Sequence, residues 1–225
     1  FSTPHGGGGP GSGPVVLAAE LAPHAPVPWV VHGENGFALV EHVEGEAAHS
    51  IGRLKGFHGQ MGMFVRALSY MMSHGSDGLR QVAEDAVLNA NYLRVKLQDV
   101  MSVAFPGICM HEVLFDDTFL KDSGITTLDF AKALIDEGFH PMTMYFPLVV
   151  HGALLIEPTE TESKASLDQF AAVLRGLVGR IKAGEAAEFR AAPMLTPRRR
   201  LDETGAARKP VLRWRPEPDH RRAAE

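Results

Sequence analysis

A run of glycines near the start of the chain is the strongest local signal for chemistry in this sequence. Residues 6–9 are all glycine, and Gly11 and Gly13 come soon after. Residues without side chains let the backbone take positive φ angles and bring several N–H groups close to an anion such as phosphate. The Gly-Lys-Ser/Thr ending of a nucleotide P-loop is absent, as are the strand and spacing of a dinucleotide-binding loop. On the residues alone, a plain flexible loop is favoured over an anion site.

Three further residue types could take part in binding. His5, beside the glycines, offers a flat ring and two nitrogens, although a turn residue after Pro4 is the simpler interpretation. Cys109, His111 and Glu112 are metal-capable, but strand alternation would put Glu112 on the face opposite the other two. The sequence therefore predicts no metal site there.

Basic residues gather near the end of the chain, where Asp202 and Glu203 interrupt them. A guanidinium among them could pair with a carboxylate or a phosphate, because arginine presents a planar fork of donors. Surface solvation is nevertheless the favoured interpretation of this cluster, which comprises Arg198, Arg199, Arg200, Arg208, Lys209, Arg213 and Arg215.

Composition limits the classes of protein that this chain can belong to. Its 225 residues are 45% hydrophobic and 22% charged, as in ordinary globular proteins. A net charge of −5 predicts no nucleic-acid partner, and the lack of an apolar run of 18 residues predicts no membrane span. A single cysteine suits a reducing compartment such as the cytoplasm. The chain starts without methionine or signal-peptide features, so we expect it to begin inside a longer protein.

The elements that must position these residues follow from periodicity. Pro14 can open a short helix through Leu21, and a short strand is expected at 37–40 in an otherwise irregular stretch. Helical periodicity begins after Ser50 and breaks at Gly75 and Gly78, and a second helix is expected along Leu79 to Leu97. Beyond residue 100 we expect strands at 108–115, 143–146 and 153–156, and helices at 128–137 and 163–182, the last with Thr159 and Glu162 at capping-box spacing. This order indicates an α+β or α/β fold.

Several segments together resemble the second subunit of the split-type P-protein family of the glycine cleavage system. They are Phe-Ser-Thr-Pro-His-Gly-Gly-Gly-Gly-Pro-Gly at 1–11, Ala-Val-Leu-Asn-Ala-Asn-Tyr at 86–92, Ile-Glu-Pro-Thr-Glu-Thr-Glu-Ser-Lys at 156–164, and Arg-Arg-Leu-Asp-Glu at 199–203 followed by Ala-Ala-Arg-Lys-Pro-Val-Leu-Arg-Trp at 206–214. The chain departs from the family at His58 and Gln60, where tyrosine and asparagine are usual.

The resemblance implies an α/β protein with the pyridoxal-phosphate-dependent transferase fold of type I. Residues 1–95 would then form the end of the large cofactor domain, residues 96–215 a smaller C-terminal α+β domain, and residues 216–225 a solvated tail. The family's Schiff-base lysine would lie just upstream of Phe1, so none of the seven lysines in this chain takes that role.

The resemblance also implies a function and a cofactor site. The family releases CO2 from glycine and transfers the aminomethyl group to the lipoyl arm of H-protein, using pyridoxal 5'-phosphate. The expected partners are the first P-protein subunit, lipoylated H-protein and glycine, in a hetero-oligomer. Two alternatives stay open: another fold-type-I enzyme, such as an aminotransferase or lyase, or a non-catalytic structural subunit. The expected cofactor-binding residues are Ser2, Thr3, His5, Gly6, Gly7, Gly8 and Gly9.

Overall fold

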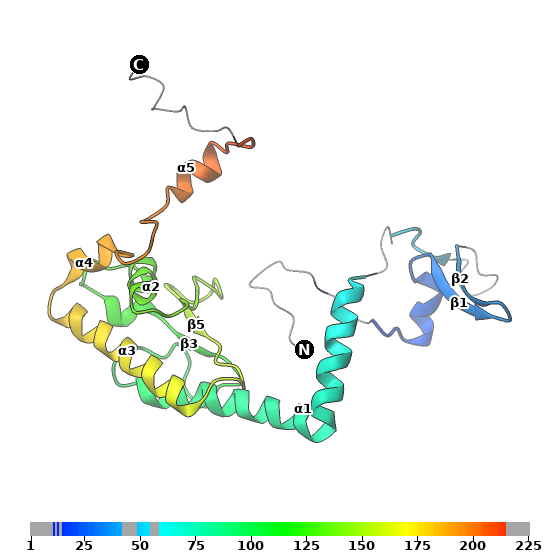
Figure 1. Cartoon of the computed structure of the whole chain (residues 1–225), viewed down its shortest axis with the longest axis horizontal. Coiled ribbons are helices and arrows are strands. Elements are labelled where there is room, and N and C mark those ends of the chain that lie inside the picture. Colours follow the sequence, from blue (N-terminus) through cyan, green and yellow to red (C-terminus); the bar gives the residue numbers. More distant parts are fainter. Residues whose placement is uncertain (1–10, 12, 14, 42–48, 55–58, 215–225) are drawn as a thin grey trace, which may run out of the picture. The chain divides into compact units, whose positions relative to one another are not determined.

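The computed structural model describes residues 11, 13, 15–41, 49–54 and 59–214, and Figure 1 traces the elements in chain order. By its internal contacts the chain divides into two compact units, residues 1–79 and residues 80–225. We describe each unit by itself. Among the described residues, no helix combines the length and the apolar composition needed to cross a membrane.

The first unit contains a short 3-10 helix, η1 (Ala19–His24), and a two-stranded antiparallel hairpin, β1 (Trp29–Gly33) and β2 (Gly36–Val40). The expected strand at 37–40 is confirmed as β2. Its partner, β1, was not predicted from the sequence. Gly36, with φ +95°, follows Asn35 at the turn, and Asn-Gly is a strong hairpin signal. The helix expected from Pro14 to Leu21 is instead η1, displaced toward the carboxyl end.

The proline-rich stretch before the hairpin is held by residues about 25 positions later. The Val27 N–H donates to the Gly52 carbonyl at 3.1 Å, and the Ser50 hydroxyl donates to the Ala25 carbonyl at 2.6 Å. These bonds satisfy backbone groups in a segment whose prolines prevent regular structure.

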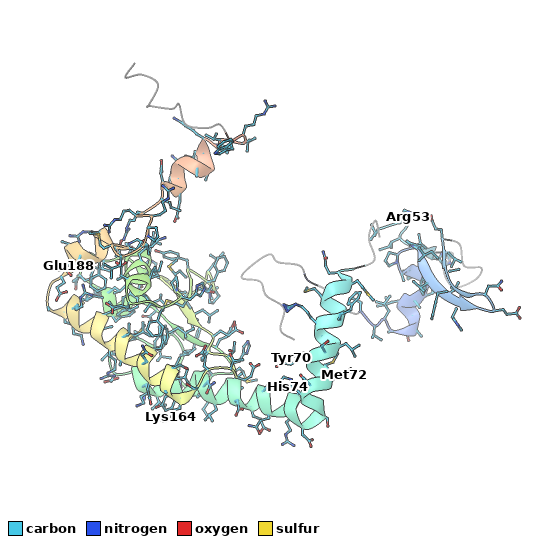
Figure 2. All side chains as sticks on the ribbon, in the orientation of Figure 1. Arg53, Tyr70, Met72, His74, Lys164 and Glu188 are labelled. Carbon is cyan, nitrogen blue, oxygen red and sulfur yellow. The ribbon has the colours of Figure 1, made fainter. Side chains whose placement is uncertain are left out.

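Helix α1 (Met61–Leu97) contains one non-helical residue, Gly75, with φ 65° and ψ −176°. The predicted break is therefore confirmed. The Gln60 carbonyl accepts the first helical hydrogen bonds from Met63 and Phe64. Tyr70 and His74, one turn apart before the break, stack with ring centroids 4.2 Å apart (Figure 2). The carboxyl-terminal part of α1 belongs to the second unit, where Leu93 and Leu97 are fully buried.

The second unit has a three-stranded antiparallel sheet in the order β3-β5-β4. Its strands are β3 (Val113–Phe115), β4 (Thr143–Met144) and β5 (Leu154–Ile156), each shorter than the sequence predicts. Val113 pairs with Ile156, and Phe115 with Leu154. All four of these side chains are buried, because alternate residues of each strand face the core.

Helices pack around this sheet. They are η3 (Asp117–Leu120), α2 (Thr127–Asp136), α3 (Lys164–Lys182) and α4 (Ala186–Ala191). A further helix, α5 (Glu203–Arg208), follows them and has no buried residue. A capping box between Thr126 and Asp129 starts α2. For α3 the capping prediction was wrong: the Ser163 hydroxyl accepts from the Ser166 N–H at 3.1 Å, so the cap lies four residues after Thr159.

A single apolar core joins α1, the sheet, α2, α3 and α4. The apolar stripe predicted for 163–182 is confirmed, since Leu167, Ala171, Leu174, Val178 and Ile181 all face this core. The remaining large, fully buried side chains include Phe115, Phe130, Leu134 and Phe189. The second unit is thus the α+β structure that the sequence predicts.

Candidate functional site

The predicted cofactor-binding residues Ser2, Thr3, His5, Gly6, Gly7, Gly8 and Gly9 lie outside the described residues, as does His58. The described glycines that follow, Gly11 and Gly13, are exposed, and a Cβ on either would meet no heavy atom within 4 Å.

A groove of about 530 Å³ lies between the loop that precedes β3 and the loop that follows β4. Phe105, Ile108, Phe146 and Pro147 line it from these loops, and Leu155 lines it from β5. Its charged lining residues are Arg94, from the last turns of α1, and Glu112. The groove is therefore largely apolar, as ligand and partner sites commonly are.

The loop before β3 is fixed by the side chain of Asn91 on α1. The Asn91 amide donates to the Cys109 carbonyl at 2.7 Å and accepts from the Cys109 N–H at 3.1 Å. Cys109 is half-buried and packs against the core. Burial raises the pKa of its thiol, so it is a poor nucleophile.

His111, Glu112 and Glu157 bring three metal-capable groups within 4.8 Å of one another. The prediction that His111 and Glu112 point to opposite faces was wrong, because β3 begins only at Val113 and residues 109–112 do not alternate. The His111 Nε2 lies 3.7 Å from Glu112 Oε1 and 4.0 Å from Glu157 Oε1. His111 and Glu157 are exposed and Glu112 is half-buried, and the three groups pair with one another near the surface.

A second groove, of about 380 Å³, lies between residues 138–142 and residues 156–159, the latter in the segment 156–164 that resembles the P-protein family. Phe139 and Phe170 form an apolar wall, with ring centroids 5.3 Å apart. His140, Glu157 and Glu162 also line this groove. Glu162 accepts from the Ser166 hydroxyl at 2.7 Å, which places its carboxylate over the first turn of α3.

An aspartate–histidine pair lies at the start of η3. His151 Nδ1 is 3.0 Å from Asp117 Oδ1 and 2.9 Å from Asp117 Oδ2, and this contact raises the pKa of the imidazole. Asp117 also lies against the backbone of Gly152, whose φ is +56°. Asp117, 34 positions earlier, thus orients the His151 ring. Hydrophobic periodicity in the sequence gives no sign of this pair.

A third charged cluster joins α1 to α3. Asp168 accepts hydrogen bonds from Lys164, at 2.5 Å, and from the Tyr92 hydroxyl, and Lys96 lies 3.5 Å away. Figure 2 marks Lys164 at the start of α3. The bonds from Lys164 and Tyr92 lower the pKa of Asp168 to about 2. Lys164 and Lys96 therefore form ion pairs with Asp168 that connect α1 to α3.

Within the basic cluster near the carboxyl end, Arg200 pairs with a buried carboxylate. Arg200 Nη2 lies 2.6 Å from Asp129 Oδ1, and its guanidinium donates to the carbonyls of Ala192 and Phe189. Asp129 has only 7% of its side chain exposed. The prediction of surface solvation was therefore wrong for Arg200, which fastens the segment after α4 to α2.

Comparison with known proteins connects this structure to one family. The family model described as "Glycine dehydrogenase, C-terminal domain" matches residues 82–195, nearly all of the ordered core of the second unit. A protein of Caulobacter vibrioides named "Probable glycine dehydrogenase (decarboxylating) subunit 2" is 69% identical over 96% of this chain and 42% of its own length. A protein of the same name from Kosmotoga olearia is 49% identical over 96% of this chain and 44% of its own length.

A crystal structure of glycine decarboxylase (P-protein) of the glycine cleavage system, in inhibitor-bound form, matches with a TM-score of 0.51 at 18% identity. The match covers 67% of this chain and 35% of that one, and it confirms the predicted fold, that of type I pyridoxal-phosphate enzymes. The chain spans less than half the length of the curated relatives that it matches. It belongs to the glycine dehydrogenase C-terminal domain family.

Proposed function

We propose that this chain is part of the second subunit of a glycine decarboxylase, which releases CO2 from glycine and transfers the aminomethyl group to the lipoyl arm of H-protein. The observation that carries the proposal is the 69% identity to the Caulobacter vibrioides protein over 96% of the chain. The resemblance of residues 1–11 to the family's glycine loop supports the same assignment. Because the Schiff-base lysine is expected upstream of Phe1, we expect these 225 residues to be inactive alone.

The proposed cofactor is pyridoxal 5'-phosphate, which supplies an electron sink for the carbanion left when CO2 departs. The backbone N–H groups of Gly6, Gly7, Gly8 and Gly9 suit an anionic phosphate, and Ser2, Thr3 and His5 add side-chain donors. Residues 1–95 would form the end of the large cofactor domain. Residues 96–215 would form the smaller C-terminal domain, and residues 216–225 would be a solvated tail. We propose that the assembly works in the cytoplasm with the first P-protein subunit.

The test is to produce the complete subunit with the first subunit and to measure CO2 release from carboxyl-labelled glycine in the presence of lipoylated H-protein. We expect release that depends on glycine, on H-protein and on both subunits. The matched control replaces the lysine expected just upstream of Phe1 by alanine, which should abolish both release and the yellow absorbance of bound cofactor.

Two other results would replace the proposal. Turnover of another amino acid that requires a keto-acid acceptor, without glycine-dependent CO2 release, would indicate an aminotransferase. Cleavage of another amino acid without any acceptor would indicate a lyase. A complete subunit that binds its partner but never binds the cofactor would indicate a structural subunit.

A further inference from the structure

Two loops of the second unit, which line one groove, expose large apolar side chains that we call the two-loop face. The loop at 103–110 exposes Phe105, Ile108 and Met110 by 60%, 86% and 72%. The loop at 145–150 exposes Phe146, Leu148 and Val149 by 57%, 81% and 85%. Phe105, Ile108 and Phe146 line the same groove of about 530 Å³, so the two loops form one surface. Apolar patches of this kind mark interaction sites.

The backbone under the two-loop face is held in place. The reciprocal bonds between Asn91 and Cys109 fix the first loop, and the Ala104 N–H donates to the Leu114 carbonyl at 3.0 Å. In the second loop, the Tyr145 N–H donates to the Ala153 carbonyl at 2.8 Å. A face that is ordered before it binds loses little conformational entropy on binding.

The charged residues around the two-loop face indicate which chemical groups a binding partner must carry. Residues 103–110 and 145–150 contain no charged side chain. Of the two charged residues that line the groove, Glu112 has His111 at 3.7 Å. The Arg94 guanidinium instead meets two neutral amide oxygens, of Asn91 at 3.4 Å and of Gln98 at 3.3 Å. Within the described part of the chain, no carboxylate lies within ion-pair distance of Arg94. The groove therefore has apolar walls and a guanidinium, that of Arg94, which can bind a carboxylate.

We propose that the two-loop face binds a segment of its own subunit that lies outside these 225 residues, and that this segment brings an apolar side chain into the groove and a carboxylate to Arg94. The inference rests on the proposed function in taking the chain as part of a longer subunit. The Caulobacter vibrioides relative has more than half of its length outside the match. A covalently attached surface meets the face at a higher effective concentration than a separate chain does.

The experiment places the photo-reactive amino acid p-benzoylphenylalanine at position 108, and separately at position 148, in the complete subunit assembled with the first subunit. After irradiation, mass spectrometry identifies the attachment site. We expect intrachain adducts from both positions, within one peptide region that precedes the residue matching Phe1 and contains Asp or Glu. Adducts to the first subunit, to a second copy or to residues 1–225, or no adduct at all, would overturn the proposal.

The role of Arg94 is tested in the same assembly by hydrogen exchange of the peptides covering 103–110 and 145–150. Arg94→Met should speed their exchange about tenfold, because the covering segment loses its ion pair. The matched control is Arg80→Met, which removes an exposed guanidinium paired with Glu84 one turn away on the same helix. Equal exchange in the two variants would contradict a carboxylate at Arg94. Neither readout depends on glycine turnover, so failure here is distinguishable from failure of the proposed function.

Discussion

Asn91 and Cys109 form a closed pair, in which one amide side chain satisfies both the N–H and the carbonyl of a residue 18 positions away. The amide thereby replaces the pairing that a neighbouring strand would give. This is why the loop before β3 is ordered although it belongs to no sheet.

Asn91→Ala removes both bonds and leaves the half-buried Cys109 backbone groups without these partners. We expect a loss of about 1–3 kcal/mol in the free energy of unfolding. Denaturant unfolding measures the loss, and the reaction of Cys109 with a thiol reagent should speed up because the loop opens. Asn89→Ala is the control, since Asn89 is half-buried like Asn91 but donates only one bond, to the Thr159 carbonyl at 2.9 Å. Equal effects of the two substitutions would contradict a special role for Asn91.

Gly152 cannot be replaced without displacing Asp117. A Cβ at this position would lie 2.2 Å from Asp117 Cγ, and φ is +56°, a conformation that costs other residues energy. Gly152→Ala should therefore combine backbone strain with overpacking and destabilise the protein by about 2–4 kcal/mol in thermal unfolding.

A substitution at Gly138 separates the effect of backbone strain from that of overpacking. The φ of Gly138 is +83°, but a Cβ there would meet nothing within 4 Å. Gly138→Ala should show the backbone strain alone, about 1 kcal/mol. Adding Asp117→Ala should partly rescue Gly152→Ala. If the two glycine variants lost the same stability, close contact with Asp117 would be irrelevant.

The Asp168 carboxylate should titrate well below an ordinary aspartate. Lys164 and then Tyr92 are the largest causes of its pKa of about 2, against an ordinary value of 3.8. Because the folded pKa is depressed, the stabilising contribution is present above pH 3.8 and is lost as the pH falls toward 2. Tyr92→Phe should move the pKa, followed by carboxyl NMR, back toward 3.8. Tyr145→Phe is the control and should leave it unchanged.

The contact between Arg200 and Asp129 should contribute strongly to stability. Burial alone would raise the pKa of Asp129, but its bonds from Thr126 and Arg200 outweigh burial and lower it. Arg200→Ala leaves a buried carboxylate without its cation, and we expect a loss of about 3 kcal/mol near neutral pH. Since the folded pKa is lowered, the difference from the parent should shrink as the pH falls below 3.8.

Arg198→Ala provides the comparison for Arg200→Ala in the same unfolding measurements. Arg198 is exposed, so its replacement should change stability by less than about 0.5 kcal/mol. A loss at Arg198 as large as that at Arg200 would mean that the whole basic cluster, and not the Arg200–Asp129 pair alone, holds the segment after α4.

The family and the main helices could be predicted from the sequence. Residues 86–92 and 156–164 carry motifs specific enough to indicate the family, and the stripe from Leu167 to Ile181 predicts α3 to within a residue at each end. Gly75 marks the break in α1 because glycine alone adopts its backbone angles at little cost. These features depend on neighbours within a turn or two, so local patterns suffice.

The strand order, the true cap of α3 and the pairing of Arg200 with Asp129 were decided only by the tertiary structure. Strand β5 lies between β3 and β4, a pairing that no local pattern specifies. Arg200 reads as a surface residue until packing brings Asp129, 71 positions earlier, to its guanidinium. The two-loop face likewise joins segments about 40 residues apart. Such contacts depend on the free energy of the whole core, whereas helical periodicity depends on the chain's own geometry.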